Sequence, residues 1–202
     1  MTEQKEINII RIVKEDILRI LQEQKEKKAS IQFIDLEIDV SNLFFQRAIS
    51  ELKKENLIKC FKSYIFLTED GKNDAQKITK KHLILKKYFK STRDSEEAYK
   101  MAHILEHYVS EQVIRNIEKL STFKEKNLGI ILTKLKANIE YLISDIIIPR
   151  GGLFERIVSM GIFPGENIKI ANNISNGVII KIKNKKIALD KNIAEKIKAL
   201  KI

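Results

Sequence analysis

The chain of 202 residues has no tryptophan, two prolines, seven glycines, three histidines and a single cysteine. Because Cys60 has no second cysteine to pair with, a disulfide within the chain is excluded, which fits a reducing compartment. The scarcity of proline and glycine leaves few breaks in regular structure, and a hydrophobic content of 44% is too high for a disordered chain. The composition predicts a folded, helix-rich protein with one large domain or a few small ones.

Long apolar runs are also missing. The most apolar stretch, residues 141–149, is interrupted by Asp145 and is far shorter than the ~20 residues of a membrane-spanning helix. Residues 1–10 begin with charged side chains and show no apolar core before a cleavage site, so we expect no signal peptide. These features predict a cytoplasmic protein with no membrane partner.

Acidic residues are outnumbered by basic ones. The chain holds 38 Lys and Arg against 27 Asp and Glu, a net charge of +11. Such an excess favours a polyanionic partner, most often nucleic acid, although solvated lysine-rich helix faces would give the same charge. Residues 150–202 hold eleven basic and four acidic side chains, whereas residues 30–67 hold five of each. Charge alone therefore does not locate a DNA-reading element.

The order of elements in the first third is more informative. Apolar residues recur at helical spacing over 7–26, a short apolar segment follows at 31–38, and Ser41 is a good N-cap for a second long helix. Two short β-like runs, 57–61 and 64–68, come next. This order predicts a winged helix-turn-helix whose third helix enters the DNA major groove.

The third helix supplies the candidate DNA contacts. Leu43 would meet thymine methyl groups, Gln46 and Arg47 would reach polar base edges, and lysines would contact phosphates. The alternative is a solvated lysine face, and we expect Phe45 to be a core residue rather than a contact. The predicted DNA-binding residues are Ser41, Asn42, Leu43, Gln46, Arg47, Lys53, Lys54 and Lys62.

All three histidines fall within a window of 26 residues. His103, Glu106 and His107 stand at i, i+3 and i+4 of a helix predicted to begin near Ser95, so they share one face. Two imidazoles and a carboxylate suit a transition-metal ion, with Fe, Mn, Zn, Co and Ni all chemically suitable. Structural histidines at helical spacing by chance are the alternative interpretation.

Two stretches resemble a known family. The helix that follows the hairpin reads LTEDGKNDAQKITKKH (67–82), and a later helix carries His103, Glu106, His107 and Ser110 in the order HILEHYVS. Together they resemble the diphtheria-toxin-repressor family of metal-dependent transcriptional regulators over about 15–120. The segments MGIFPG, VIIKIK and IALD after residue 149 resemble the small SH3-like barrel of FeoA-type proteins.

The resemblance implies a metal site and its ligands. His103, Glu106 and His107 would bind the ion, His82 matches a further ligand position, and Asp16 on the first helix would complete the site. Glu15 is the alternative to Asp16. The favoured cofactor is a divalent transition metal, Fe²⁺ or Mn²⁺, with Zn²⁺ as an alternative.

The sequence also departs from the family pattern. Position 103 is a histidine where the family has cysteine or glutamate, which leaves the preferred metal open. An ancillary site would need a carboxylate at position 86 and a histidine at position 99, but the chain has Lys86 and Tyr99 there. We therefore expect one metal site per subunit.

The fold class expected from the whole sequence is α+β and mostly helical. The expected domains are a winged-helix DNA-binding domain at 1–70, a helical metal-binding and dimerisation domain at 71–122, a linker or helix at 123–148, and an SH3-like barrel at 149–202.

The sequence predicts a metal-dependent transcriptional regulator, a repressor that binds a double-stranded DNA operator as a homodimer and has no small-molecule substrate. Dimerisation would use the apolar helix faces between Ser95 and Leu120. Metal-independent regulation and a FeoA-like accessory role in ferrous iron transport are the alternatives. The chain lacks a Gly-rich phosphate loop, a nucleophile elbow and an HExxH motif, so we predict no enzymatic activity.

Overall fold

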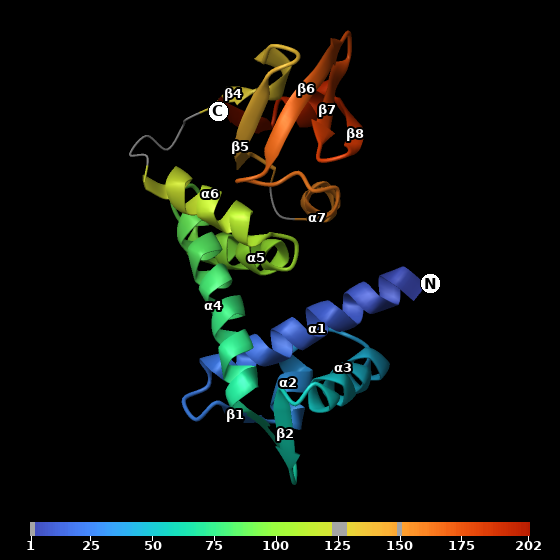
Figure 1. Ribbon diagram of the computed structural model, residues 1–202, viewed down its shortest axis with the longest axis vertical. Coiled ribbons are helices and arrows are strands. Elements are labelled where there is room, and N and C mark those ends of the chain that lie inside the picture. Colours follow the sequence, from blue (N-terminus) through green and yellow to red (C-terminus); the bar gives the residue numbers. More distant parts are fainter. Residues whose placement is uncertain (1–2, 123–128, 149–150) are drawn as a thin grey trace. The chain divides into compact units, whose positions relative to one another are not determined.

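The structure is a computed structural model that describes residues 3–122, 129–148 and 151–202. The fold mixes helix and sheet and is 52% helical, which confirms the predicted class. It divides into two compact units, residues 1–82 and 83–202, and α4 (Glu69–Phe89) contributes residues to both (Figure 1). Within the described ranges, no helix is both long enough and apolar enough to cross a membrane.

The first unit has the predicted order of helices followed by a hairpin. Its elements before α4 are α1 (Glu3–Glu23), β1 (Lys28–Ser30), α2 (Ile31–Glu37), α3 (Asn42–Lys54), β2 (Ile58–Phe61) and β3 (Tyr64–Leu67). The sheet is antiparallel in the order β1-β3-β2, so the short β1 extends the predicted hairpin by one strand. Three residues are too few to show the alternation by which a strand is recognised in a sequence.

The core of the first unit follows from helical periodicity. Ile10, Val13, Ile17 and Leu21 form the buried face of α1. Phe45 on α3 is fully buried, which confirms that it is a core residue. Ser41 occupies the N-cap position of α3 as expected, although its side chain makes no capping hydrogen bond.

The start of α4 explains the LTEDG segment. The Thr68 hydroxyl accepts a hydrogen bond from the Gly71 amide at 3.0 Å, as expected for an N-cap. A Cβ atom on Gly71 would stand 1.9 Å from the carbonyl oxygen of Leu57, so only glycine lets the helix approach the turn before β2 this closely.

The second unit joins helices to a six-stranded sheet. After the end of α4 it contains α5 (Ser95–Glu106), α6 (Glu111–Thr122), β4 (Ile130–Ile131), the 3₁₀-helix η1 (Leu132–Lys134), β5 (Glu140–Ile146), α7 (Gly152–Ser159), β6 (Asn167–Ile174), β7 (Gly177–Ile182), β8 (Lys185–Asp190), α8 (Lys191–Ala194) and β9 (Ile197–Lys201). The described strands pair in the order β4-β9-β5-β6-β7-β8.

Two expectations for this unit need correction. The sheet is open rather than closed into a barrel, because β4 and β8 form its two edges among the described strands and β4 has only two residues to offer. Residues 130–146, where a linker or helix was expected, form β4, η1 and β5, and β5 pairs with both β6 and β9. Residues 123–128 lie outside the described part.

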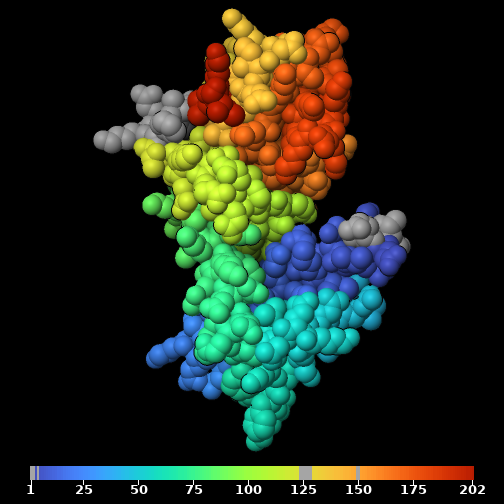
Figure 2. All heavy atoms as spheres, viewed as in Figure 1, coloured from blue at the N-terminus to red at the C-terminus, as the bar shows by residue number. Residues whose placement is uncertain are grey.

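One hydrophobic cluster holds the helices and the sheet of the second unit together. Met101 and Leu105 of α5 and Ile117 of α6 share it with Ile143 of β5 and Ile170 of β6. Figure 2 shows α5 and α6 directly against the C-terminal sheet. The apolar faces that we predicted to form a dimer are therefore covered by the chain's own C-terminal domain.

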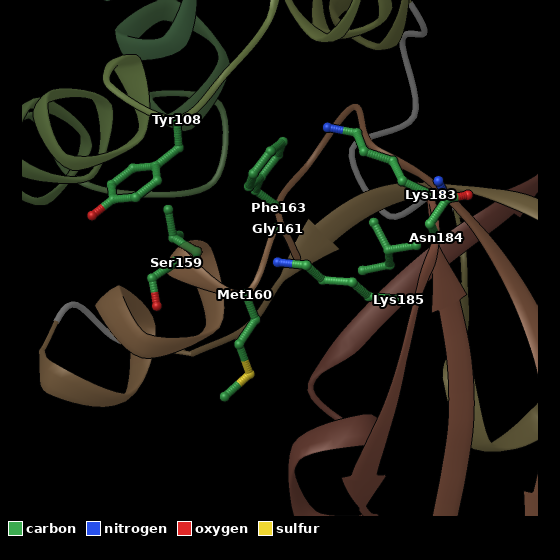
Figure 3. A pocket seen from close by; sticks show the side chains of 10 residues that line it. Tyr108, Ser159, Met160, Gly161, Phe163, Lys183, Asn184 and Lys185 are labelled. Carbon is green, nitrogen blue, oxygen red and sulfur yellow. The ribbon is translucent and has the colours of Figure 1, made fainter. Parts of the chain in front are cut away.

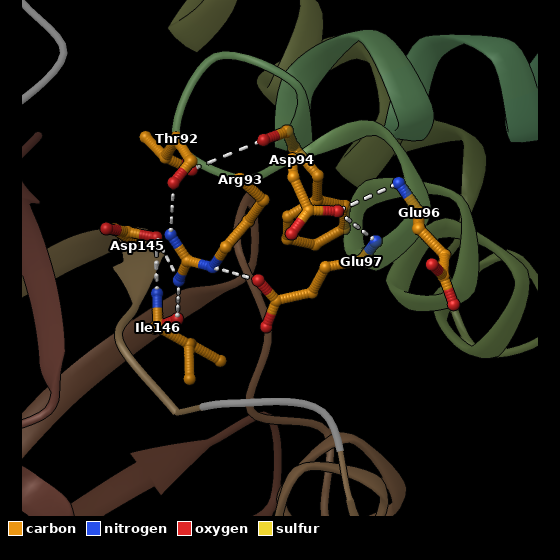
Figure 4. Close-up of polar contacts among 8 residues, drawn as sticks. Thr92, Arg93, Asp94, Glu96, Glu97, Asp145 and Ile146 are labelled. Atoms are coloured by element: carbon orange, nitrogen blue, oxygen red, sulfur yellow. Dashed lines mark hydrogen bonds and ion pairs between the residues drawn. The ribbon is translucent and has the colours of Figure 1, made fainter.

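Polar contacts reinforce the same junction. The Arg93 guanidinium donates a hydrogen bond to the Ile146 carbonyl at 2.7 Å and lies 3.8 Å from the carboxylates of Asp145 and Glu97 (Figure 4). The Tyr88 hydroxyl donates to the Ser144 carbonyl. Because Arg93 and Tyr88 come from the α4–α5 region and their backbone acceptors from β5, these contacts connect the helices to the sheet.

Candidate metal centre

The helix α5 is oriented by its cap and its buried face. The Asp94 carboxylate accepts hydrogen bonds from the amides of Glu96 and Glu97 at 2.9 and 2.8 Å, which fixes the first turn. Met101 and Leu105 point into the core. This rotation places His103 on a partly exposed side of the same helix.

Three polar side chains converge at the end of α5. His103, Glu106 and His107 each offer a ligand atom, and these atoms lie within 4.8 Å of one another. The two imidazole rings have centroids 5.5 Å apart, and His107 Nε2 lies 3.8 Å from Glu106 Oε1. Glu106 is 3% exposed and His107 is 8% exposed. Two nitrogen donors and a carboxylate in a largely buried cluster fit a divalent transition metal, whose ligands lie about 2 Å from the ion.

The other two predicted ligands belong to the first unit. Asp16 is a buried carboxylate on α1, with one oxygen 3.7 Å from the Arg19 guanidinium. The alternative ligand, Glu15, forms an ion pair of 2.7 Å with Arg11. His82 on α4 is 2% exposed. Three of the five predicted ligands therefore lie at the end of α5, and the other two, Asp16 and His82, lie in the first unit.

The positions expected for an ancillary metal site are occupied by a different interaction. The Lys86 ammonium lies 5.0 Å from the centre of the Tyr99 ring, a cation–π contact. A fixed positive charge at this point opposes the binding of a second divalent cation.

The predicted DNA-contacting side chains lie on the surface of the first unit. All eight are exposed: Ser41, Asn42, Leu43, Gln46, Arg47, Lys53, Lys54 and Lys62. Arg47 already has a protein partner, since its guanidinium lies 3.3 Å from the Glu6 carboxylate. Sequence reasoning missed Phe61, which is 66% exposed at the end of β2 with the Lys62 ammonium 5.5 Å from its ring centre. The position of Phe61 beside the hairpin turn was the feature of the sequence that could have indicated its exposure.

Two family matches cover most of the chain. Residues 68–128 match the iron dependent repressor, metal binding and dimerisation domain, and residues 130–199 match the FeoA domain. The α5 cluster lies within the first match. The two matches confirm the resemblance in the sequence over residues 68–128 and 130–199.

The chain is also similar to several solved structures. The manganese regulator SloR is 19% identical, with a TM-score of 0.48, over 94% of this chain and 98% of that one. The IdeR protein of T. acidophilum is 18% identical, with a TM-score of 0.43, over 100% and 99%. The iron(II) transport protein A of Clostridium thermocellum is 29% identical, with a TM-score of 0.34, over 36% and 46%. No curated protein matches the chain.

Proposed function

We propose that this chain is a metal-dependent transcriptional repressor in which a divalent metal ion gates operator binding by a homodimer. One observation carries the proposal: two imidazoles and a carboxylate converge at the end of α5, within the segment that matches a metal-binding and dimerisation domain. The exposed side chains of α3 and of the β2–β3 hairpin would supply the DNA-reading surface in the same chain.

His103, Glu106 and His107 form the core of the proposed metal site. Imidazole nitrogen and carboxylate oxygen together suit Fe²⁺, Mn²⁺ and Zn²⁺. We propose Asp16 as the ligand from α1, because it is buried while Glu15 is paired with Arg11. A buried carboxylate favours positive charge nearby, and the Arg19 guanidinium lies 3.7 Å from one Asp16 oxygen. His82 is proposed as a further ligand of the same ion.

The residues of the site would act by joining the two units. A bound ion supplies the positive charge that draws carboxylates and imidazoles to one point. Asp16 then holds α1, and with it the DNA-reading α3, in one arrangement relative to the helix that carries His103 and His107. In a dimer, each subunit would present one α3 helix to DNA. A dimer that holds its two α3 helices at a fixed separation binds an operator with two half-sites better than a dimer in which that separation varies.

DNA contacts would divide into two classes. Leu43, Gln46 and Asn42 stand at the exposed start of α3, where a reading helix meets base edges. Lys53, Lys54 and Lys62 would contact phosphates, which adds affinity with little sequence information. Arg47 would have to leave the Glu6 carboxylate before its guanidinium could contact DNA.

The test combines metal content with DNA binding. Operator duplexes are selected from a random-sequence library with the chain and Mn²⁺, and their affinity is measured by anisotropy with metal and with chelator. We expect one tightly bound ion per chain and an operator affinity that falls about 5–150-fold in chelator. A sedimentation measurement checks the dimer.

The matched variant is His107→Ala, with Lys100→Ala as the control, since Lys100 is an α5 residue outside the cluster. His107→Ala should weaken metal binding at least about tenfold, and Lys100→Ala should leave it unchanged. Equal operator affinity with metal and chelator would refute metal gating and favour a metal-independent regulator. Two tightly bound ions per chain would show that Lys86 and Tyr99 do not exclude a second site.

A further inference from the structure

A cavity of about 310 Å³ lies within the second unit, and none of His103, Glu106 and His107 lines it. Three segments line it: Tyr108 after α5, residues 158–163 at the end of α7, and the β7–β8 hairpin at 182–185 (Figure 3). Its volume lies at the lower end of the range for small-molecule sites, about 300–1,000 Å³. The cavity is therefore large enough for a compact organic molecule.

The lining combines buried apolar side chains with one tyrosine ring. Val158, Phe163 and Ile182 line the cavity with side chains that are otherwise buried in the core. Tyr108 is 42% exposed, and its hydroxyl has no hydrogen-bond partner among the described residues. An apolar floor beside a tyrosine ring favours a flat, ring-containing occupant.

The hairpin gives the cavity a positive charge. The Lys183 ammonium is partly offset by Glu166, whose carboxylate lies 3.6 Å away. Lys185 has no acidic partner in the described part of the chain. Figure 3 shows its side chain reaching from the hairpin across the cavity toward the turn that follows α7. The occupant should therefore carry a negative charge near Lys185.

We propose that this cavity binds a compact aromatic anion and that the bound anion modulates the metal site. The route is covalent and short: Tyr108 follows His107 directly, so an occupant that holds the tyrosine ring also restrains the end of α5. This regulatory part rests on the proposed function, whereas anion binding itself does not.

Naphthalene sulfonate is a suitable probe. It combines a flat apolar ring with one negative charge, its sulfonate binds divalent cations poorly, and a chain without tryptophan leaves its fluorescence easy to follow. We expect saturable binding of one probe per chain in the absence of metal. Lys185→Gln should weaken it about five- to tenfold, in line with the loss of one charge-assisted contact, and Tyr108→Ala should weaken it as well.

Lys186→Gln is the matched control. Lys186 is exposed on the same strand, but alternation directs its side chain to the opposite face and it does not line the cavity. The neutral naphthalene sulfonamide should bind more weakly and be insensitive to Lys185→Gln. Equal effects of the two lysine variants, or no saturable binding, would overturn the anion site.

The regulatory part has its own measurement. Mn²⁺ affinity, determined with and without saturating probe, should differ by about fivefold, the lower end of typical coupling between sites. Tyr108→Ala should abolish that difference while leaving Mn²⁺ binding without probe unchanged. If the probe binds but Mn²⁺ affinity does not respond, the coupling is refuted. If Mn²⁺ does not bind at all, the proposed function fails instead, and the anion site stands on the metal-free titration.

Discussion

Histidine at position 103 determines the donor chemistry of the α5 cluster. Its side chain offers a ligand atom within 4.8 Å of those of Glu106 and His107. The resemblance in the sequence implies a thiolate or a carboxylate at this position, and the chain has a second imidazole instead. Imidazole suits Zn²⁺, Fe²⁺ and Ni²⁺, whereas carboxylate suits Mn²⁺. The metal preference of this chain should therefore depend on this one residue.

The first prediction tests that dependence. His103→Glu should lower Zn²⁺ affinity about tenfold more than it lowers Mn²⁺ affinity, because it exchanges a nitrogen donor for an oxygen donor. Competition titrations against a chromophoric chelator measure both affinities. His103→Gln, which cannot supply a charged ligand, is the control and should weaken both metals. If His103→Glu left the ratio of Zn²⁺ affinity to Mn²⁺ affinity unchanged, residue 103 would not be a ligand.

Asp16 and Glu15 provide the second prediction. Asp16→Ala should lose metal-stimulated operator binding, with a loss bounded by about 1–3 kcal/mol of coupling. Its binding to random DNA should keep the same salt dependence, because phosphate contacts come from lysine and arginine. Glu15→Ala should keep the metal response, since Glu15 pairs with Arg11. Anisotropy titrations on operator and random duplexes, with metal and with chelator, distinguish the two; the reverse pattern would make Glu15 the ligand.

The turn between α7 and β6 shows how one glycine permits an element contact. Gly165 has φ +85°, and a Cβ atom there would stand 2.8 Å from the carbonyl oxygen of Val113 in α6. The Gly165 carbonyl also accepts a hydrogen bond from the Asn116 amide at 2.8 Å. The sheet and α6 can approach this closely only because residue 165 has no side chain.

The third prediction follows from this contact. Gly165→Ala should lower the free energy of unfolding by about 2–3 kcal/mol, through left-handed strain and the clash with α6. Gly152→Ala is the matched control, because a Cβ atom there meets nothing within 4 Å, and its effect should be within about 1 kcal/mol of zero. Urea unfolding measures both. Equal stability of the two variants would show that the turn can move away from α6.

Tyr88 gives a fourth prediction, on pH. Burial raises the pKa of Tyr88 above its ordinary value of 10.0, with the Asp145 carboxylate adding to the shift. A phenol whose folded pKa is raised contributes stability that is present below the unfolded pKa and lost as pH rises beyond it. Tyr88→Phe should therefore be about 1 kcal/mol less stable than wild type near pH 8, through the lost hydrogen bond to Ser144.

That difference should shrink above about pH 10, where the unfolded tyrosine ionises and wild type loses its advantage. Urea unfolding of both proteins at about pH 8 and about pH 10.5 gives the two differences. A difference that grows with pH would contradict the assigned direction of the shift.

Regular helices could be predicted from the sequence and irregular strands could not. The stripe of α1 and the N-cap position of Ser41 could be predicted because helical period and cap preference are local properties of the sequence. The strand β5 was missed because a bulge between Ile143 and Asp145 breaks the alternation of buried and exposed residues. Two-residue β4 has no pattern at all, and its strand state depends on pairing with distant β9.

The same contrast between local and long-range features holds for the candidate site. The α5 cluster was predictable, because i, i+3 and i+4 on a helix imply proximity without knowledge of the fold. The packing of the C-terminal sheet on the apolar faces of α5 and α6 could not be predicted, because the sequence of an apolar helix face does not identify the element that packs against it. The cavity at Tyr108 was equally hidden, since its lining comes from three segments far apart in the sequence.

At the scale of the whole molecule, the two units make the proposed switch a matter of linkage. The α5 cluster lies in residues 83–202, and the helix α3, which we propose reads DNA, lies in residues 1–82. If the ion joins them through Asp16, metal and operator favour the same arrangement. Their effects on one another must then be equal in free energy.

The fifth prediction is this reciprocity. Saturating operator should tighten Mn²⁺ binding by the same factor by which Mn²⁺ tightens operator binding, within the typical range of about 5–150-fold. Random duplex should tighten Mn²⁺ binding much less, because phosphate contacts alone do not require fixed separation of two reading heads. In the Asp16→Ala variant both factors should fall together toward one. Mn²⁺ affinity that does not respond to operator would show that the ion acts on folding or dimer stability of residues 83–202 rather than on the arrangement of the DNA-reading unit.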